Sequence, residues 1–162
     1  MSRITEIIDH LARIQAGDPW YGPSIDRVLA GLTATQAAAH PVAGAHSSWE
    51  IVRHMLGWIA EVSRRVETGV AREPVAGDWP EASQVTEAKW RAAQAALAAA
   101  HTTLAETLRT LPERRLDDTV GDERDPALGS GVTYQVMLHG LLQHDTYHLG
   151  QIALLRKALG QG

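Results

Sequence analysis

The sequence contains no cysteine and no phenylalanine. Without cysteine, the chain has no disulfide scaffold, no cysteine-ligated zinc or iron–sulfur site and no cysteine nucleophile. The same absence fits a cytoplasmic protein, which we expect here. Residues 1–14 alternate charged and apolar side chains without a continuous apolar stretch, so they predict neither a signal peptide nor a membrane span.

An excess of positive charge is also missing. Fifteen Lys and Arg stand against nineteen Asp and Glu, for a formal net charge of −4, and no basic block stands out. We therefore expect no nucleic-acid partner and no membrane partner. The 162 residues are 44% hydrophobic and 21% charged, which excludes general disorder and predicts one folded domain over residues 1–162.

Glycine and proline divide the chain into segments with helical periodicity. The expected helices are 2–16, 24–31, 47–68, 81–111 and 133–159, with loops at 70–81 and 112–131. No strand-like alternation appears. Three long helices and a broken first one predict an all-α four-helix bundle.

The core face of the helix expected at 81–111 is assigned from its apolar residues. They are Ala92, Ala96, Ala100, Leu104, Leu108 and Leu111. His101 is not one of the residues assigned to this core face. With His10, His40 and His46, it is expected in a loop or on an exposed face and is assigned no function.

Two histidines lie within the core stripe of the last expected helix. At roughly 100° per residue, the stripe spans a sector of about 80°. Its members are Met137, Leu141, His144, His148, Ile152 and Leu155. The imidazoles of His144 and His148 are expected about 6 Å apart along the axis, and His139 points away from them. Side chains at i and i+4 can grip one cation.

A third histidine, His54, lies at the edge of the apolar stripe of the helix expected at 47–68. Buried imidazoles are unfavourable without partners, and a metal would satisfy one nitrogen on each. Three imidazoles from two helices would leave a coordination position open, as in reactive sites. Imidazole suits zinc, nickel, iron or copper. The alternative is a set of core histidines bonded to the backbone or to each other.

Three neighbouring residues are weaker candidates. Asp145 either orients a ligand imidazole from outside the ligand set or is a solvated helix residue. Trp58 either lines a pocket or belongs to the core, and Gln151 either lines a pocket or bonds a buried neighbour. The segment from His144 to His148 has Asp where the zinc-protease helix needs Glu as general base, so proteolysis is set aside.

Three segments resemble the DinB-like superfamily in order along the chain: WYGPSIDRVLAGLT (20–33), HSSWEIVRHMLGW (46–58) and HDTYHLGQIALLRKALG (144–160). The resemblance implies an up-down-down-up four-helix bundle that holds a divalent metal, for which we expect zinc, nickel or iron. Carried over residue by residue, the metal ligands are His54, His144 and His148. Characterised members of the superfamily use bacillithiol, mycothiol or glutathione for S-transfer or isomerisation.

The resemblance leads to two functional hypotheses. The first is a metal-dependent transferase that acts with a low-molecular-weight thiol, whose sulfur would arrive with the cofactor. The alternative is a non-enzymatic stress-response module that binds a metal or a small ligand. The resemblance also implies a homodimer, and the many small residues of the helix expected at 81–111 agree with it, because Ala-rich helix faces permit close approach. A DNA-repair role finds no support in a net-acidic chain.

Overall fold

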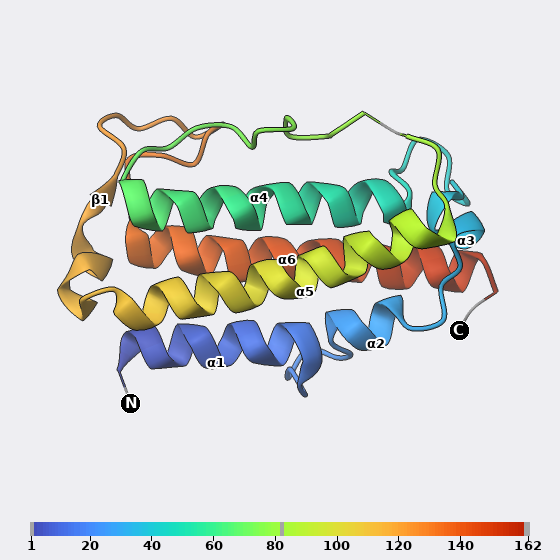
Figure 1. The fold of residues 1–162 in the computed structure, drawn as a ribbon, viewed down its shortest axis with the longest axis horizontal. Coiled ribbons are helices and arrows are strands. Elements are labelled where there is room, and N and C mark those ends of the chain that lie inside the picture. The colour runs from blue at the N-terminus through green and yellow to red at the C-terminus, as the bar shows by residue number, and fades with distance from the viewer. Residues whose placement is uncertain (1, 82, 161–162) are drawn as a thin grey trace.

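The computed structural model describes residues 2–81 and 83–160, and its long elements are all helices (Figure 1). In chain order the elements are α1 (Arg3–Ala16), α2 (Ile25–Leu29), α3 (Ala34–Ala38), α4 (Ser48–Thr68), α5 (Glu87–Thr110), the 3-10 helix η1 (Glu113–Asp117), β1 (Thr119–Val120), β2 (Val132–Thr133) and α6 (Tyr134–Ala158). None of these helices has both the length and the hydropathy that a membrane span requires.

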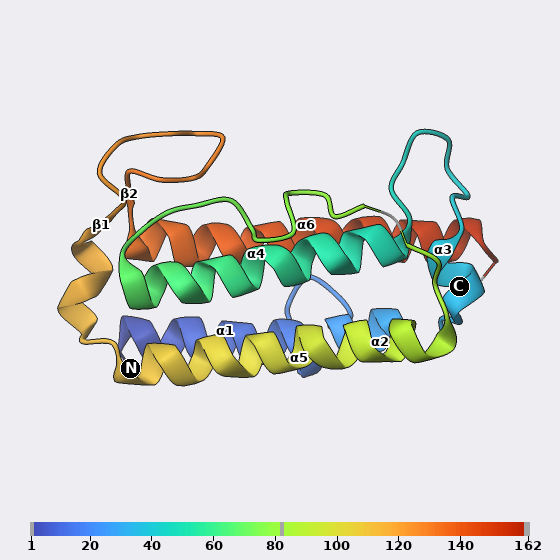
Figure 2. The ribbon, with the colours of Figure 1, turned by 45° about the horizontal axis from the view of Figure 1, so that its top comes forward.

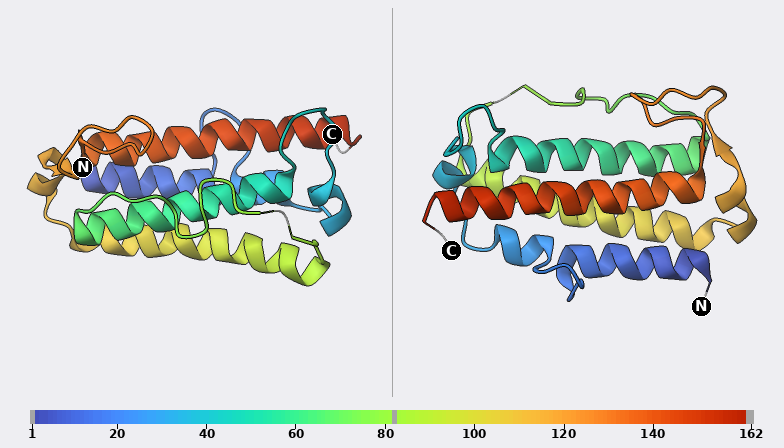
Figure 3. Two further views of the ribbon diagram at one scale, coloured as in Figure 1. Left: turned by 90° about the horizontal axis from the view of Figure 1, so that it is seen from above. Right: turned by 180° about the vertical axis from the view of Figure 1, so that it is seen from behind.

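The four long helices form an up-down-down-up bundle, which confirms the predicted fold. Helices α1 and α6 run in one direction and α4 and α5 in the other (Figures 1 and 3). Helix α4 contacts α5 and α6, and α1 contacts the same two helices. One cluster of buried apolar side chains draws members from all four. The single domain over residues 1–162 stays a prediction.

Local side-chain chemistry defines the ends of α4. The Ser47 hydroxyl accepts from the backbone amide of Glu50, and the Glu50 carboxylate accepts from the amide of Ser47, which completes a capping box. Gly69 ends the helix with a φ of 73°, a conformation that favours glycine. The predicted ends of this helix are therefore confirmed.

The connection between α4 and α5 is longer than the sequence predicted. The helix expected at 81–111 begins at Glu87, where the Thr86 hydroxyl caps it. Because α4 and α5 are parallel, the chain has to return along the length of the bundle before α5 can start (Figure 2). Helix α5 therefore starts later in the chain than the sequence predicted, because the connection between two parallel helices needs more residues.

One expected loop and one segment without an assigned element contain short regular elements. Segment 112–131 holds η1 and the strand β1, and β1 pairs antiparallel with β2 in the register Thr119↔Thr133 and Val120↔Val132. Helix α3 occupies a segment for which no helix was expected. Two-residue strands are too short for a periodic pattern. Helix α3 does have a local signal, the capping box formed by Thr33 and Gln36, which sequence reasoning missed.

The predicted core face of α5 is wrong in its first half. The buried residues are Trp90, Ala93, Leu97, His101, Leu104 and Leu108. The expected stripe repeated every four residues, and at about 100° per residue such a repeat drifts by about 40° per step. A buried face combines spacings of three and four, as this one does. His101 lies on this face and is 3% exposed, which corrects its assignment to the surface.

A buried ion pair on α4 anchors the two loops that follow it in the chain. Arg65 and Glu61 are 2% and 3% exposed, with Nε of Arg65 2.9 Å from Oε1 of Glu61. Arg65 also donates to the carbonyl oxygens of Leu128 and Arg72, at 2.9 and 2.6 Å. Burial alone would raise the pKa of Glu61, but hydrogen bonds from Arg64 and Arg65 outweigh it and lower that pKa.

Replacing Arg65 should destabilise the fold. Arg65→Met removes one partner of a buried pair, and we expect the free energy of unfolding to fall by about 3 kcal/mol in urea denaturation. The matched control is Arg91→Met, since Arg91 is exposed on α5; it should stay within about 0.5 kcal/mol of the parent. Equal effects of the two substitutions would contradict a structural role for the Glu61–Arg65 pair.

Candidate metal centre

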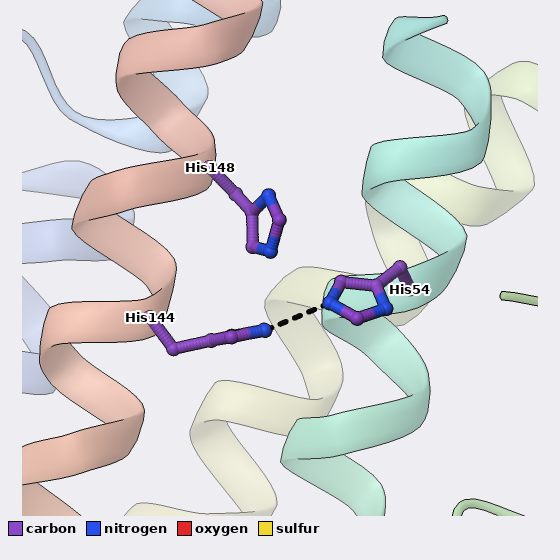
Figure 4. A group of neighbouring side chains, drawn as sticks. All are labelled: His54, His144 and His148. Carbon is purple, nitrogen blue, oxygen red and sulfur yellow. Dashed lines mark hydrogen bonds between the residues drawn. The ribbon is translucent and has the colours of Figure 1, made fainter. Parts of the chain in front are cut away.

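Three histidine side chains meet between α4 and α6 (Figure 4). His54 comes from α4, and His144 and His148 come from consecutive turns of α6. One ring nitrogen from each lies within 4.8 Å of the other two. His54 and His148 are buried, and His144 is partly exposed. The structure therefore brings together the three residues that the sequence selected, while their role as ligands stays a prediction.

Hydrogen bonds fix the tautomer of two of these rings. Nδ1 of His54 lies 2.6 Å from the backbone carbonyl oxygen of Asp78, and Nδ1 of His148 lies 2.7 Å from Oε1 of Gln151. Carbonyl oxygens only accept hydrogen bonds, so both Nδ1 atoms carry the proton. In the neutral rings, Nε2 of His54 and Nε2 of His148 are then left with lone pairs.

The third ring, that of His144, also faces an acceptor with its Nδ1. Nδ1 of His144 lies 3.5 Å from Oδ1 of the Asp145 carboxylate, and neither atom has a hydrogen-bond partner among the described residues. With its proton on this Nδ1, His144 presents the lone pair of Nε2 to Nε2 of His54, 2.8 Å away.

These nitrogen positions fit a cation. Facing lone pairs at 2.8 Å repel each other unless a positive charge lies between or beside them. A proton shared by His54 and His144 would bond those two nitrogens and leave Nε2 of His148 without a partner. A metal cation would accept a lone pair from all three nitrogens. The donor set of three neutral imidazoles suits zinc, nickel or iron.

The surroundings keep two of the imidazoles neutral. Burial lowers the pKa of His148 to about 4, and the neighbouring imidazoles of His144 and His54 act in the same direction, against the hydrogen bond that His148 donates to Gln151. Burial and the proximity of His144 also lower the pKa of His54. Only a deprotonated nitrogen binds a metal, so these shifts favour binding at neutral pH.

Asp145 is buried and belongs to the support of the cluster. It is 0% exposed, and its Oδ2 accepts from Nε2 of His101 at 3.0 Å. This overturns the alternative of a solvated helix residue and agrees with a carboxylate that orients His144. Burial alone would raise the pKa of Asp145, but the hydrogen bond from His101 and the proximity of the His144 imidazole lower it overall.

His101 is the residue of this network that sequence reasoning missed. Its Nδ1 lies 3.0 Å from the carbonyl oxygen of Leu97 and its Nε2 lies 3.0 Å from Oδ2 of Asp145, so both ring nitrogens meet acceptors. The result is a buried histidine–carboxylate pair between α5 and α6. A core stripe drawn with combined spacings of three and four would have found it.

The crossover loop after α4 covers His54. Gly77 adopts a φ of 82° in a turn closed by its amide and the carbonyl of Pro74, and the next residue, Asp78, presents its carbonyl to His54. Trp79 stacks on His54 with ring centroids 4.0 Å apart, and His46 stacks on Trp79 at 3.6 Å. Sequence reasoning missed all of these loop contacts.

The two weaker pocket candidates have different roles. Trp58 lines a cavity of about 450 Å³ that the three histidines border, and its Nε1 donates to Oδ1 of Asp78 at 2.7 Å. Gln151 is not among the residues that line this cavity, and its role as a pocket residue stays a prediction. Its side chain instead turns to His148, whose Nδ1 donates to it.

The fold and the site together define a class of protein: an up-down-down-up helical bundle with three clustered histidines. Comparison with protein-family models matches the DinB superfamily over residues 24–152, and the chain belongs to that superfamily. No curated protein and no solved structure matched the chain.

The buried His101–Asp145 pair generates a prediction about coupling. His101→Leu leaves the Asp145 carboxylate buried with one hydrogen-bond donor fewer, and should lower the free energy of unfolding by about 3 kcal/mol. Adding Asp145→Leu should recover much of that loss, because no uncompensated charge remains. Urea denaturation in EDTA measures both, with His139→Leu as the control. Additive losses in the double variant would contradict the pairing.

The pKa of His148 generates a prediction about pH. The pKa of His148 is about 4 in the folded protein and 6.5 in the unfolded chain. Above pH 6.5 His148 is neutral in both states, so its titration takes nothing from the free energy of unfolding there. As the pH falls from 6.5 to 4, the unfolded chain takes up a proton that the folded protein does not, and the free energy of unfolding decreases. In EDTA, the parent should therefore lose more stability over this range than His148→Gln does. Parallel stability curves would contradict the shift.

Proposed function

We propose that this protein is a divalent-metal-dependent transferase that acts with a low-molecular-weight thiol such as bacillithiol, mycothiol or glutathione. One observation carries the proposal: three imidazole nitrogens converge from two helices at the wall of a cavity of about 450 Å³. Three protein ligands next to open space are typical of catalytic sites, whereas a fourth protein ligand is typical of structural ones.

Each residue of the centre has a defined part in this proposal. His54, His144 and His148 would hold the cation. Asp78, Gln151 and the carboxylate of Asp145 orient their rings through Nδ1, the kind of support that metal-ligating histidines usually have. A divalent cation bound there would lower the pKa of an incoming thiol and keep it as the thiolate at neutral pH.

The transfer itself needs no side-chain nucleophile. The thiolate sulfur forms a bond to an electrophilic carbon, and the bond from that carbon to its leaving group breaks with the electron pair going to the leaving group. The thiol proton is released to solvent. The absence of cysteine from the chain is consistent with this scheme, because the sulfur arrives with the small molecule.

The test begins with the metal. Protein purified without a nickel column should contain about one divalent ion per chain by elemental analysis, and zinc or nickel added to stripped protein should raise its melting temperature. His148→Ala should abolish binding, and His139→Ala, on the same helix outside the cluster, should leave it intact. No bound metal and no thermal shift would overturn the proposal.

The thiol is tested on cobalt-substituted protein. Each thiol is added in turn, and sulfur coordination should change the visible spectrum of the cobalt site, with no change in a His54→Ala variant. The same thiol should react faster with an electrophile in the presence of metal-loaded protein. If no thiol alters the spectrum and none is consumed faster, the transferase proposal fails and the alternative of a metal-binding or ligand-binding module takes its place.

A further inference from the structure

The cavity beside the histidines has apolar walls. Helix α6 contributes Val136, Met137 and Leu141, helix α4 contributes Val62, and the loop before β2 contributes Ala127 and Leu128. The three imidazoles are among its polar lining groups. A volume of about 450 Å³ lies within the range of small-molecule sites, which are mostly apolar with a few placed polar groups.

All three ionic side chains that line the cavity have a hydrogen-bond partner within the protein. Arg65 is bonded to Glu61 and to two backbone carbonyls. Asp78 accepts from the indole of Trp58. Arg124 is the third; it is exposed and donates to the carbonyl of Ser130. A ligand that carries several charges would find little to pair with inside.

Two large apolar side chains at this cavity are exposed to solvent. Val136 is 56% exposed and Tyr147 is 64% exposed, and both are lining residues. An apolar occupant would cover part of this surface, with a gain proportional to the area removed from water.

Gly140 leaves additional room next to the histidines. It lies inside α6, one turn before His144, where glycine is less favourable than alanine by about 1 kcal/mol. A Cβ atom added at Gly140 would meet no heavy atom within 4 Å, so packing against the rest of the protein does not require glycine. Gly140 lines the cavity, and the missing side chain enlarges it beside His144.

We propose that this cavity binds the uncharged, apolar alkyl or aryl body of the electrophilic second substrate, and that Gly140 determines how large a body fits beside the histidines. This inference rests on the proposed transferase function. The low-molecular-weight thiols carry carboxylate or sugar groups, which match the apolar walls poorly, so the cavity is assigned to the acceptor of the sulfur.

The experiment uses linear alkyl hydroxamates as probes, from acetohydroxamate to octanohydroxamate, titrated calorimetrically into zinc-loaded protein. The hydroxamate head binds zinc and the chain length reports on the cavity. Affinity should rise about fourfold with each methylene until the cavity is filled, the factor that corresponds to about 0.8 kcal/mol per buried methylene. An affinity independent of chain length would overturn the proposal.

Gly140→Leu tests whether position 140 limits the size of the ligand that the cavity can hold. The variant should bind zinc and acetohydroxamate as the parent does and lose most of the gain for long chains. The matched control is Gly150→Leu: Gly150 also lies inside α6 with open space around it, but does not line the cavity. It should keep the full dependence on chain length.

The outcomes separate the two proposals. If the protein fails to bind zinc, the proposed function falls and this inference falls with it. If zinc and acetohydroxamate bind but longer chains add nothing, only the assignment of an apolar acceptor falls. If Gly140→Leu binds long chains as tightly as Gly150→Leu does, the role of Gly140 is overturned.

Discussion

The position of one proton on each imidazole is the constraint on which the candidate site depends. Hydrogen bonds to Asp78 and Gln151 hold the Nδ1 protons of His54 and His148, so their Nε2 lone pairs are directed into the space between α4 and α6. The antiparallel packing of α4 and α6 then brings Nε2 of His144 to 2.8 Å from Nε2 of His54. Three electron-pair donors in one place favour a cation there, and binding it would stabilise the folded state.

The bundle topology supplies much of the support for this site. Since α4 and α5 are parallel, their connection has to travel back along the bundle (Figure 2). Gly57 of α4 lets the loop approach closely, because a Cβ there would lie 3.3 Å from Pro74. The loop then delivers the carbonyl of Asp78 and the ring of Trp79 to His54. A bundle with short antiparallel connections would have no such segment over its histidines.

Two buried polar pairs link the cluster of histidines to other elements. The His101–Asp145 pair links α5 to the residue next to His144, so a helix without a candidate ligand takes part in orienting the cluster. The Glu61–Arg65 pair fixes the loop that carries Leu128 at the edge of the cavity. Buried charges are tolerated only when they are paired, and here the pairs join separate elements around the same site.

The sequence by itself determined the helical class, the ends of α4 and the choice of His54, His144 and His148. These follow from capping residues, glycine and the three-or-four spacing of apolar residues, all of which act within one or two turns. The tertiary structure decided the start of α5, the burial of His101, the role of Gln151 and the contacts of Asp78 and Trp79. Those features depend on which helices lie side by side and on how far a loop must travel. Such contacts join residues far apart in the chain, and no local pattern encodes them.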